Sequence, residues 1–104
     1  MEEKQGGFLP LAREVGNSRG IKIELGIPRL GNHFGWFFGM TDHLNPVRNT
    51  WTFRLAYFNG SEPSQSEDFT ALHEPWPIDE NTATAFKKAV GEAISSIKMK
   101  ANLP

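Results

Sequence analysis

Residues 31–40 read GNHFGWFFGM, and the spacing of their large side chains decides the predicted fold. Every second position carries a large apolar side chain: Phe34, Trp36, Phe38 and Met40. Phe37 stands between them, with a glycine two residues away on either side. A period of two is typical of a β-strand with one buried face. The segment therefore predicts a strand that sends four large side chains into a core and one ring, Phe37, to the opposite face.

Two neighbouring segments, 21–27 (IKIELGI) and 50–58 (TWTFRLAYF), alternate in the same way. Opposed residues of an antiparallel pair share a face, and their numbers have a constant sum. If 27 opposes 34 and 41 opposes 50, the alternating sets of apolar side chains that include Ile23, Trp36 and Phe53 lie on one side. Leu25 then faces Trp36, and Phe38 faces Phe53. A slip of one residue would turn a whole strand over, so we predict an antiparallel three-stranded meander.

The C-terminal third predicts a helix that covers this sheet. EDFTALH, 67–73, indicates a weaker fourth strand or an irregular segment. Asp79 is a candidate N-cap, with Glu80 suited to the first turn. From 80 to 100 one apolar stripe follows helical spacing: Ala83, Phe86, Ala89, Val90, Ala93, Ile94 and Ile97. The predicted fold class is α+β: an antiparallel three- to four-stranded meander with one C-terminal helix packed on one face, βββ(β)α in two layers.

The sequence predicts a flexible N-terminal arm over residues 1–19 and a single α+β domain over residues 20–104. Gly6, Gly7, Pro10 and Gly16 disfavour regular structure in the arm. Its one apolar patch, 8–11 (FLPL), would order it only by docking elsewhere.

The composition favours a small soluble, cytoplasmic protein. The chain has 104 residues and no cysteine, which excludes disulfides, thiolate metal sites and a thiol nucleophile. We find no signal peptide and no apolar run of the ~20 residues that a membrane span needs.

The net charge of −1 conceals a sorting of charge along the chain. Residues 59–81 carry six acidic side chains and no basic one, whereas 19–58 and 82–104 each sum to +3. We interpret this as complementarity between neighbouring segments plus solvation, although such asymmetry can also mark an interaction surface.

The opposite sheet face supplies the candidate binding residues: Phe37, Arg54, Lys22, Glu24, Gly35 and Gly39. In the predicted register Phe37 faces Glu24 on one side and Arg54 on the other. Glycine inside a strand often marks the close approach of a backbone or ligand. Three interpretations follow: the arm or Arg54 packs on Phe37, two copies pair through this face, or Phe37 stacks on a base while Lys22 and Arg54 hold phosphates.

A second candidate is the predicted loop 41–49, which carries Asp42, His43 and Arg48. An Asx-type turn before Pro46 is the structural interpretation of this loop. The histidines and carboxylates do not have metal-ligand spacing, and no nucleophile motif or phosphate loop occurs, so we expect no metal, no cofactor and no catalytic residue. Trp76, between two prolines, either closes the core or is exposed for recognition.

Four strands followed by a helix is an order similar to that of PC4-like and Whirly-type single-stranded-DNA-binding domains. The resemblance is one of architecture and implies a nucleic-acid platform as an alternative. The first hypothesis is a non-enzymatic binding module that self-associates as a homodimer through an outer sheet face or edge. A third is a small-molecule protein with an aromatic pocket between sheet and helix.

Overall fold

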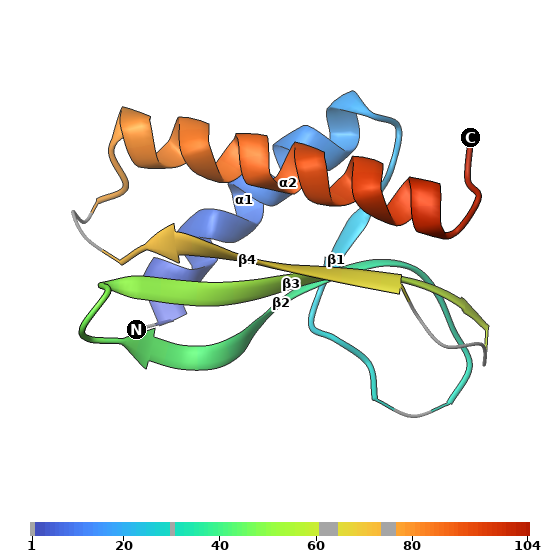
Figure 1. Cartoon of the computed structure of the whole chain (residues 1–104), viewed down its shortest axis with the longest axis horizontal. Coiled ribbons are helices and arrows are strands. Elements are labelled where there is room, and N and C mark those ends of the chain that lie inside the picture. The colour runs from blue at the N-terminus through green and yellow to red at the C-terminus, as the bar shows by residue number, and fades with distance from the viewer. Residues whose placement is uncertain (1, 30, 61–64, 74–76) are drawn as a thin grey trace.

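The protein is a two-layer α+β fold in which two helices lie on one face of a mixed sheet (Figure 1). The computed structural model describes residues 2–29, 31–60, 65–73 and 77–104. Its elements are, in chain order, α1 (Glu2–Ser18), β1 (Ile23–Leu25), β2 (His33–Asn45), β3 (Thr50–Gly60), β4 (Gln65–Leu72) and α2 (Glu80–Lys100). Among the described residues the sheet has the order β1-β2-β3-β4. The α+β class is therefore confirmed, while the single helix and the purely antiparallel meander are wrong.

Helix α2 forms as the sequence predicts. The Asp79 carboxylate accepts a hydrogen bond from the Thr82 backbone N–H at 2.8 Å, and this bond lowers the pKa of Asp79. Lys98 and Lys100 occupy the last turn, where a cation interacts favourably with the helix dipole. The buried face repeats the predicted stripe: Phe86, Val90, Ala93, Ile94 and Ile97, joined by Thr82 and Gly91.

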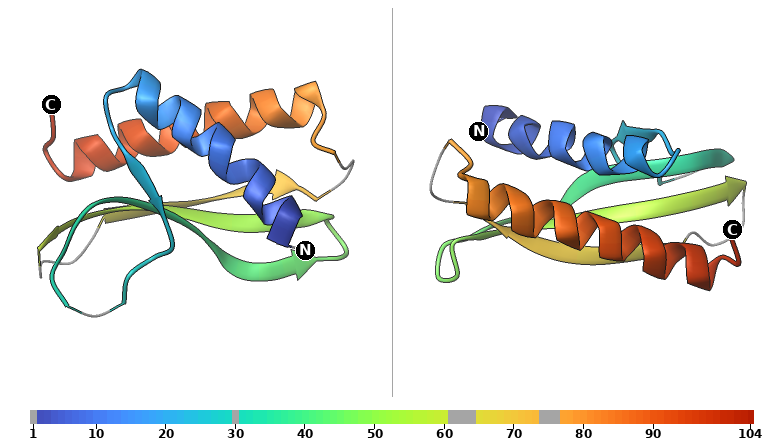
Figure 2. Two further views of the ribbon diagram at one scale, coloured as in Figure 1. Left: turned by 180° about the vertical axis from the view of Figure 1, so that it is seen from behind. Right: turned by 90° about the horizontal axis from the view of Figure 1, so that it is seen from above.

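The N-terminal segment is a helix, which corrects the predicted arm. Helix α1 packs beside α2 on the same face of the sheet (Figure 2). Phe8 and Ala12 are fully buried, and Val15 packs against the same core, so that the apolar positions follow one helical stripe. Burial of this stripe outweighs the poor helix propensity of the glycines and Pro10, because tertiary packing supplies most of the stability of a helix.

The core between helices and sheet is a stack of phenylalanine rings. The Phe8 ring lies 4.8 Å from that of Phe86 and 5.1 Å from that of Phe53. Phe38 stacks on Phe53 at 5.1 Å with an interplanar angle of 16°. The inward positions of the two central strands are buried as predicted: Trp36, Phe38, Trp51, Phe53 and Leu55. The rings fill the space between the layers, where the sequence had suggested a small-molecule pocket.

The central hairpin has the predicted faces but a register two residues away from the predicted one. Trp36 pairs with Tyr57 and Phe38 with Leu55, instead of with Leu55 and Phe53. The reason is that β2 continues to Asn45 and its register shifts twice, between Met40 and Asp42 and again before Asn45. Such bulges add residues to one strand of a pair, and alternation alone does not reveal them.

Strand β1 runs parallel to β2, which corrects the predicted first hairpin. Ile23 pairs with Trp36 and Leu25 with Phe38. After Leu25 the chain turns at Gly26, with φ of +96°, and returns to enter β2 ahead of its own partners. The segment swings to the sheet side that bears no helix (Figure 2, left). A short parallel connection suffices here because β1 has only three residues.

Two residues predicted for the core are exposed instead. Phe34 is 70% and Leu25 is 66% exposed. Phe34 pairs with Asn59 near the far end of the hairpin, and Leu25 is the last residue of a short edge strand. Both therefore lie at the limits of the regular sheet, where the two helices cover less of it.

Strand β4 forms, and it explains the sorted charges. It pairs antiparallel with β3, and Ala71 and Phe69 point to the core as predicted. Its two acidic residues pair with the flanking basic segments: Asp68 with Arg54 and Glu67 with Lys100. Complementarity between segments is thus confirmed for these pairs. Trp76 lies outside the described residues. Neither helix in the described part has the length and apolar character needed to cross a membrane.

Candidate functional site

The sheet face that bears no helix, called here the outer face, carries a cluster of three rings. His33 and Phe37 come from β2 and Phe58 from β3. The Phe37 and Phe58 rings meet edge to face at 5.5 Å. The His33 ring lies 6.4 Å from Phe37 and 6.2 Å from Phe58, again with its plane steeply inclined. We call these residues the outer aromatic cluster.

The outer aromatic cluster supplies the ring neighbours of Phe37. Phe8, in the apolar patch of the N-terminal segment, lies in the core on the other side of the sheet and does not pack on Phe37. Ala56 stands opposite Phe37 in the register and is only 1% exposed, although it belongs to the outer face. Phe58 stands opposite Gly35, and the bulged register thereby brings it next to Phe37.

The two glycines that flank Phe37 have different reasons for being glycine. A Cβ on Gly39 would lie 3.1 Å from Ile27 Cγ1, so the segment after β1 lies directly on this position. This is the close approach that a strand glycine predicts. Gly35 has φ of +112°, a conformation that side chains other than glycine rarely adopt, and a Cβ there would meet nothing within 4 Å. The outer face is therefore covered at Gly39 and open at Gly35.

The charged residues of the outer face lie in ion pairs. Arg54 stands opposite Gly39 and Asp68 in the two registers, not opposite Phe37 as predicted. It donates from Nε and Nη2 to the two Asp68 carboxylate oxygens, and this hydrogen bonding raises the pKa of Arg54. Glu24 does pair with Phe37, as predicted. Its carboxylate lies 3.4 Å from Lys22 Nζ.

The predicted functional loop 41–49 is mostly strand. Asp42 and His43 belong to β2, and their side chains lie outside the part of the chain described. Arg48 lies exposed in the turn between β2 and β3. Asn45 Oδ1 accepts hydrogen bonds from the backbone N–H groups of Val47 and Arg48, at 3.0 and 3.1 Å. The predicted Asx-type turn is thereby confirmed.

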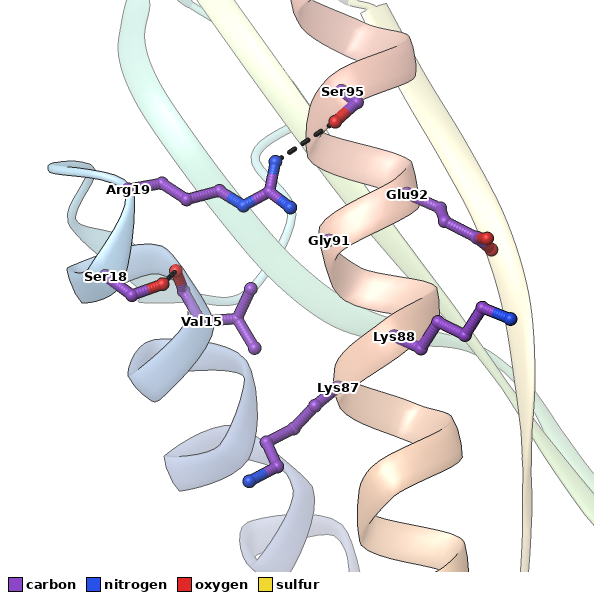
Figure 3. Close-up of a pocket in the computed structure, with 8 residues that line it drawn as sticks. All are labelled: Val15, Ser18, Arg19, Lys87, Lys88, Gly91, Glu92 and Ser95. Atoms are coloured by element: carbon purple, nitrogen blue, oxygen red, sulfur yellow. Dashed lines mark hydrogen bonds between the residues drawn. The ribbon is translucent and has the colours of Figure 1, made fainter.

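A second surface, a groove between α1 and α2, escaped the sequence analysis (Figure 3). It encloses about 420 Å³ and is lined by Val15, Ser18, Arg19, Lys87, Lys88, Gly91, Glu92 and Ser95. The sequence predicts an arm over residues 1–19, and therefore does not predict the wall of this groove that α1 forms. The available signal was Gly91, an isolated glycine within an otherwise regular helical stripe, for which close packing is the usual reason.

Among the described side chains, no group of three or more histidine, aspartate or glutamate residues could hold a metal ion. The two surfaces instead offer rings bordered by ion pairs on one side of the molecule and cations around a groove on the other. The chain matches no protein-family model, no curated protein and no solved structure, so its function is inferred from these surfaces.

Proposed function

We propose that the protein is a small non-enzymatic interaction module that forms a homodimer through the outer face of its sheet. The observation that carries this proposal is the outer aromatic cluster on a sheet face without a helix. Both helices pack on the opposite face, so no helix of the described residues covers the three half-buried rings. Apolar side chains gathered on a surface and bordered by polar ones are typical of a protein interface.

The surroundings of the cluster suit a two-fold interface. The ion pairs Lys22–Glu24 and Arg54–Asp68 border the rings, and within each pair the two opposite charges belong to the same chain and cancel. A partner copy would therefore meet an apolar centre and a rim without excess charge. The Cα extents of the two longer axes are 38 and 27 Å. A face of this size accommodates the ~800 Å² per partner that a standard interface buries. At Gly35 a Cβ would meet open space, so a second sheet can approach closely there.

The alternatives from the sequence receive less support. Lys22 and Arg54, the phosphate partners of a nucleic-acid platform, each lie beside a carboxylate, so the two pairs bring no excess of positive charge to this face. The rings expected to line a small-molecule pocket instead contact one another in the core. Self-association needs neither an excess of positive charge on this face nor an opening of the core.

The test is the mass of the protein in solution, measured by light scattering at high micromolar concentration. We expect a dimer for the parent chain and a monomer for Phe37→Glu, because a carboxylate at the centre of the interface would be buried without a partner. Met99→Glu is the matched control, since Met99 is 80% exposed on α2, away from the sheet; it should remain a dimer. Circular dichroism verifies that both variants fold.

A monomeric parent chain would refute the proposal, as would a Phe37→Glu variant that dimerises like the control. A second arm adds a single-stranded oligonucleotide at two salt concentrations. The nucleic-acid alternative would be favoured if the parent chain is monomeric, binds the oligonucleotide in a salt-sensitive manner, and loses this binding in Phe37→Glu.

A further inference from the structure

The groove between α1 and α2 brings together cations from two distant parts of the chain. Arg19 follows the end of α1, while Lys87 and Lys88 lie on α2. Glu92 is the single acidic residue of the lining. The groove therefore has an excess of positive charge in a chain whose net charge is −1. It opens on the helix-bearing side of the molecule and shares no residue with the outer face.

Arg19 reaches across the groove and keeps most of its donors available. Its Nη1 donates to Ser95 Oγ at 3.0 Å, a neutral acceptor, and no carboxylate of the described residues forms an ion pair with it. A guanidinium has five N–H donors arranged in a planar fork. Figure 3 shows this fork extended from the end of α1 to the side of α2.

Gly91 makes the position of this fork possible. The residue is buried beneath the groove, and a Cβ there would lie 2.9 Å from Arg19 Nη2. Any side chain at 91 would thus displace the guanidinium. Val15, on the facing helix, is 4.0 Å from the same point, so the two helices pack closely here.

Lys87 supplies a second positive charge one helical turn from Gly91, and in Figure 3 it also points towards α1. Its Nζ lies 2.9 Å from a carboxylate oxygen of Glu14, an exposed residue. Exposed ion pairs contribute little free energy, so an anion in the groove can compete with Glu14 for this ammonium. Lys88 and Glu92 point to the other side of α2 in the same view.

We propose that this groove binds a compact phosphate-type anion, either a phosphate ester or a polyphosphate. The Arg19 fork matches the geometry of phosphate oxygens and binds them in a bidentate manner. Lys87 adds a point charge, and the Ser95 hydroxyl can reorient to donate. The lining has one apolar side chain, Val15, and no aromatic one, so recognition is confined to the anionic group.

The test is a titration with inorganic pyrophosphate at low ionic strength, followed by ¹H–¹⁵N NMR spectra of the full chain. We expect the amides of Gly91 and Ser95 to shift most, and Arg19→Gln to weaken binding about tenfold, the loss of one charge-assisted contact. Arg48→Gln is the matched control, because Arg48 is exposed in the β2–β3 turn; its affinity should stay within about twofold of the parent.

Gly91→Ala provides a variant that keeps the fold. Alanine favours a helix over glycine, and its Cβ would push the Arg19 guanidinium aside. We expect undiminished thermal stability together with weaker pyrophosphate binding. Equal losses of pyrophosphate affinity in Arg19→Gln and Arg48→Gln would overturn the proposal.

A vesicle arm identifies the source of the anion. Phosphatidylcholine vesicles with and without phosphatidic acid are sedimented with the protein. Pyrophosphate binding without vesicle binding assigns free phosphate compounds, whereas Arg19-dependent binding of the acidic vesicles assigns a lipid headgroup. If neither pyrophosphate nor vesicles bind, the proposal is wrong. The proposed homodimer is unaffected by any of these outcomes.

Discussion

Arg54 on β3 and Asp68 on β4 stand directly opposite each other and form a bidentate ion pair. The two N–O distances are 2.7 and 3.0 Å. The pair joins the central hairpin to the edge strand on the outer face, where the acidic segment of the chain meets a basic one. The side chains are 41% and 44% exposed, so solvent screens much of their attraction.

The Arg54–Asp68 pair should contribute a small, salt-dependent coupling. We expect a double-mutant cycle of Arg54→Ala, Asp68→Ala and the double variant to give about 0.5 kcal/mol, and less at high salt. Urea unfolding of the four proteins at two salt concentrations measures this coupling. A coupling that does not change with salt would contradict the exposed, screened geometry.

Glu67 should make stability depend on pH. Its carboxylate accepts hydrogen bonds from Lys100 and Ser96, and these lower its pKa below the ordinary value of 4.5. A carboxylate with a lowered folded-state pKa stabilises the fold above its unfolded pKa, and this contribution is lost as the pH falls through the folded value. The difference in melting temperature between the parent and Glu67→Gln should therefore be largest near neutral pH and shrink below about pH 4.5.

Glu92→Gln serves as the control for Glu67. Glu92 lies exposed on α2 and forms no ion pair with any described residue. We expect its melting temperature at neutral pH to stay close to that of the parent. An equal loss in both variants would show that general charge balance, not the contacts of Glu67, sets the effect.

Phe8 and Phe34 should differ sharply when truncated. Phe8 is 1% exposed and contacts the rings of Phe53 and Phe86. We expect Phe8→Ala to lower the free energy of unfolding by about 3–5 kcal/mol, the usual cost of removing a buried ring. Phe34→Ala should cost less than about 1 kcal/mol, because this ring is mostly exposed. Similar values for both in urea unfolding would contradict the packing of α1.

Gly16 and Gly91 are buried helical glycines for which alanine should have opposite effects. At Gly16 a Cβ would lie 2.8 Å from Ile23 Cδ1 and 3.2 Å from the Ile21 carbonyl oxygen. Neither can move freely, because Ile23 is fully buried and the oxygen belongs to the backbone. We expect Gly16→Ala to cost about 1–3 kcal/mol.

In Gly91→Ala the one tight contact that the Cβ would make is with the end of the flexible Arg19 side chain, at 2.9 Å, whereas Val15 at 4.0 Å is in ordinary contact. The substitution should stabilise the protein by about 0.5–1 kcal/mol through helix propensity. Thermal unfolding of the two glycine variants checks the contrast in sign. An equal loss of thermal stability in both variants would mean that the Arg19 side chain cannot move away from a Cβ at position 91.

The sequence by itself determined helix α2 with its Asp79 cap and the strands of the central hairpin. It also determined most of the hairpin residues that face the core, although not the exposed Phe34. The candidate residue Phe37 was also found on the correct face. These features depend on local chemistry and on periodicity within one segment. The helical character of residues 2–18 was not apparent, because glycines and Pro10 masked a stripe that only burial against the sheet makes favourable.

Tertiary structure decided the register, the direction of β1 and the two surfaces for which binding is proposed. Alternation has a period of two, so faces stay the same when a register moves by two residues or when a strand is reversed. In the predicted antiparallel register Leu25 pairs with Trp36, whereas in the observed parallel register it pairs with Phe38 and Ile23 pairs with Trp36. The same alternating residues are opposed in both cases. The bulges in β2 bring Phe58 beside Phe37, and the packing of α1 on α2 creates the Arg19 groove. Both depend on contacts between distant segments, which a local pattern does not contain.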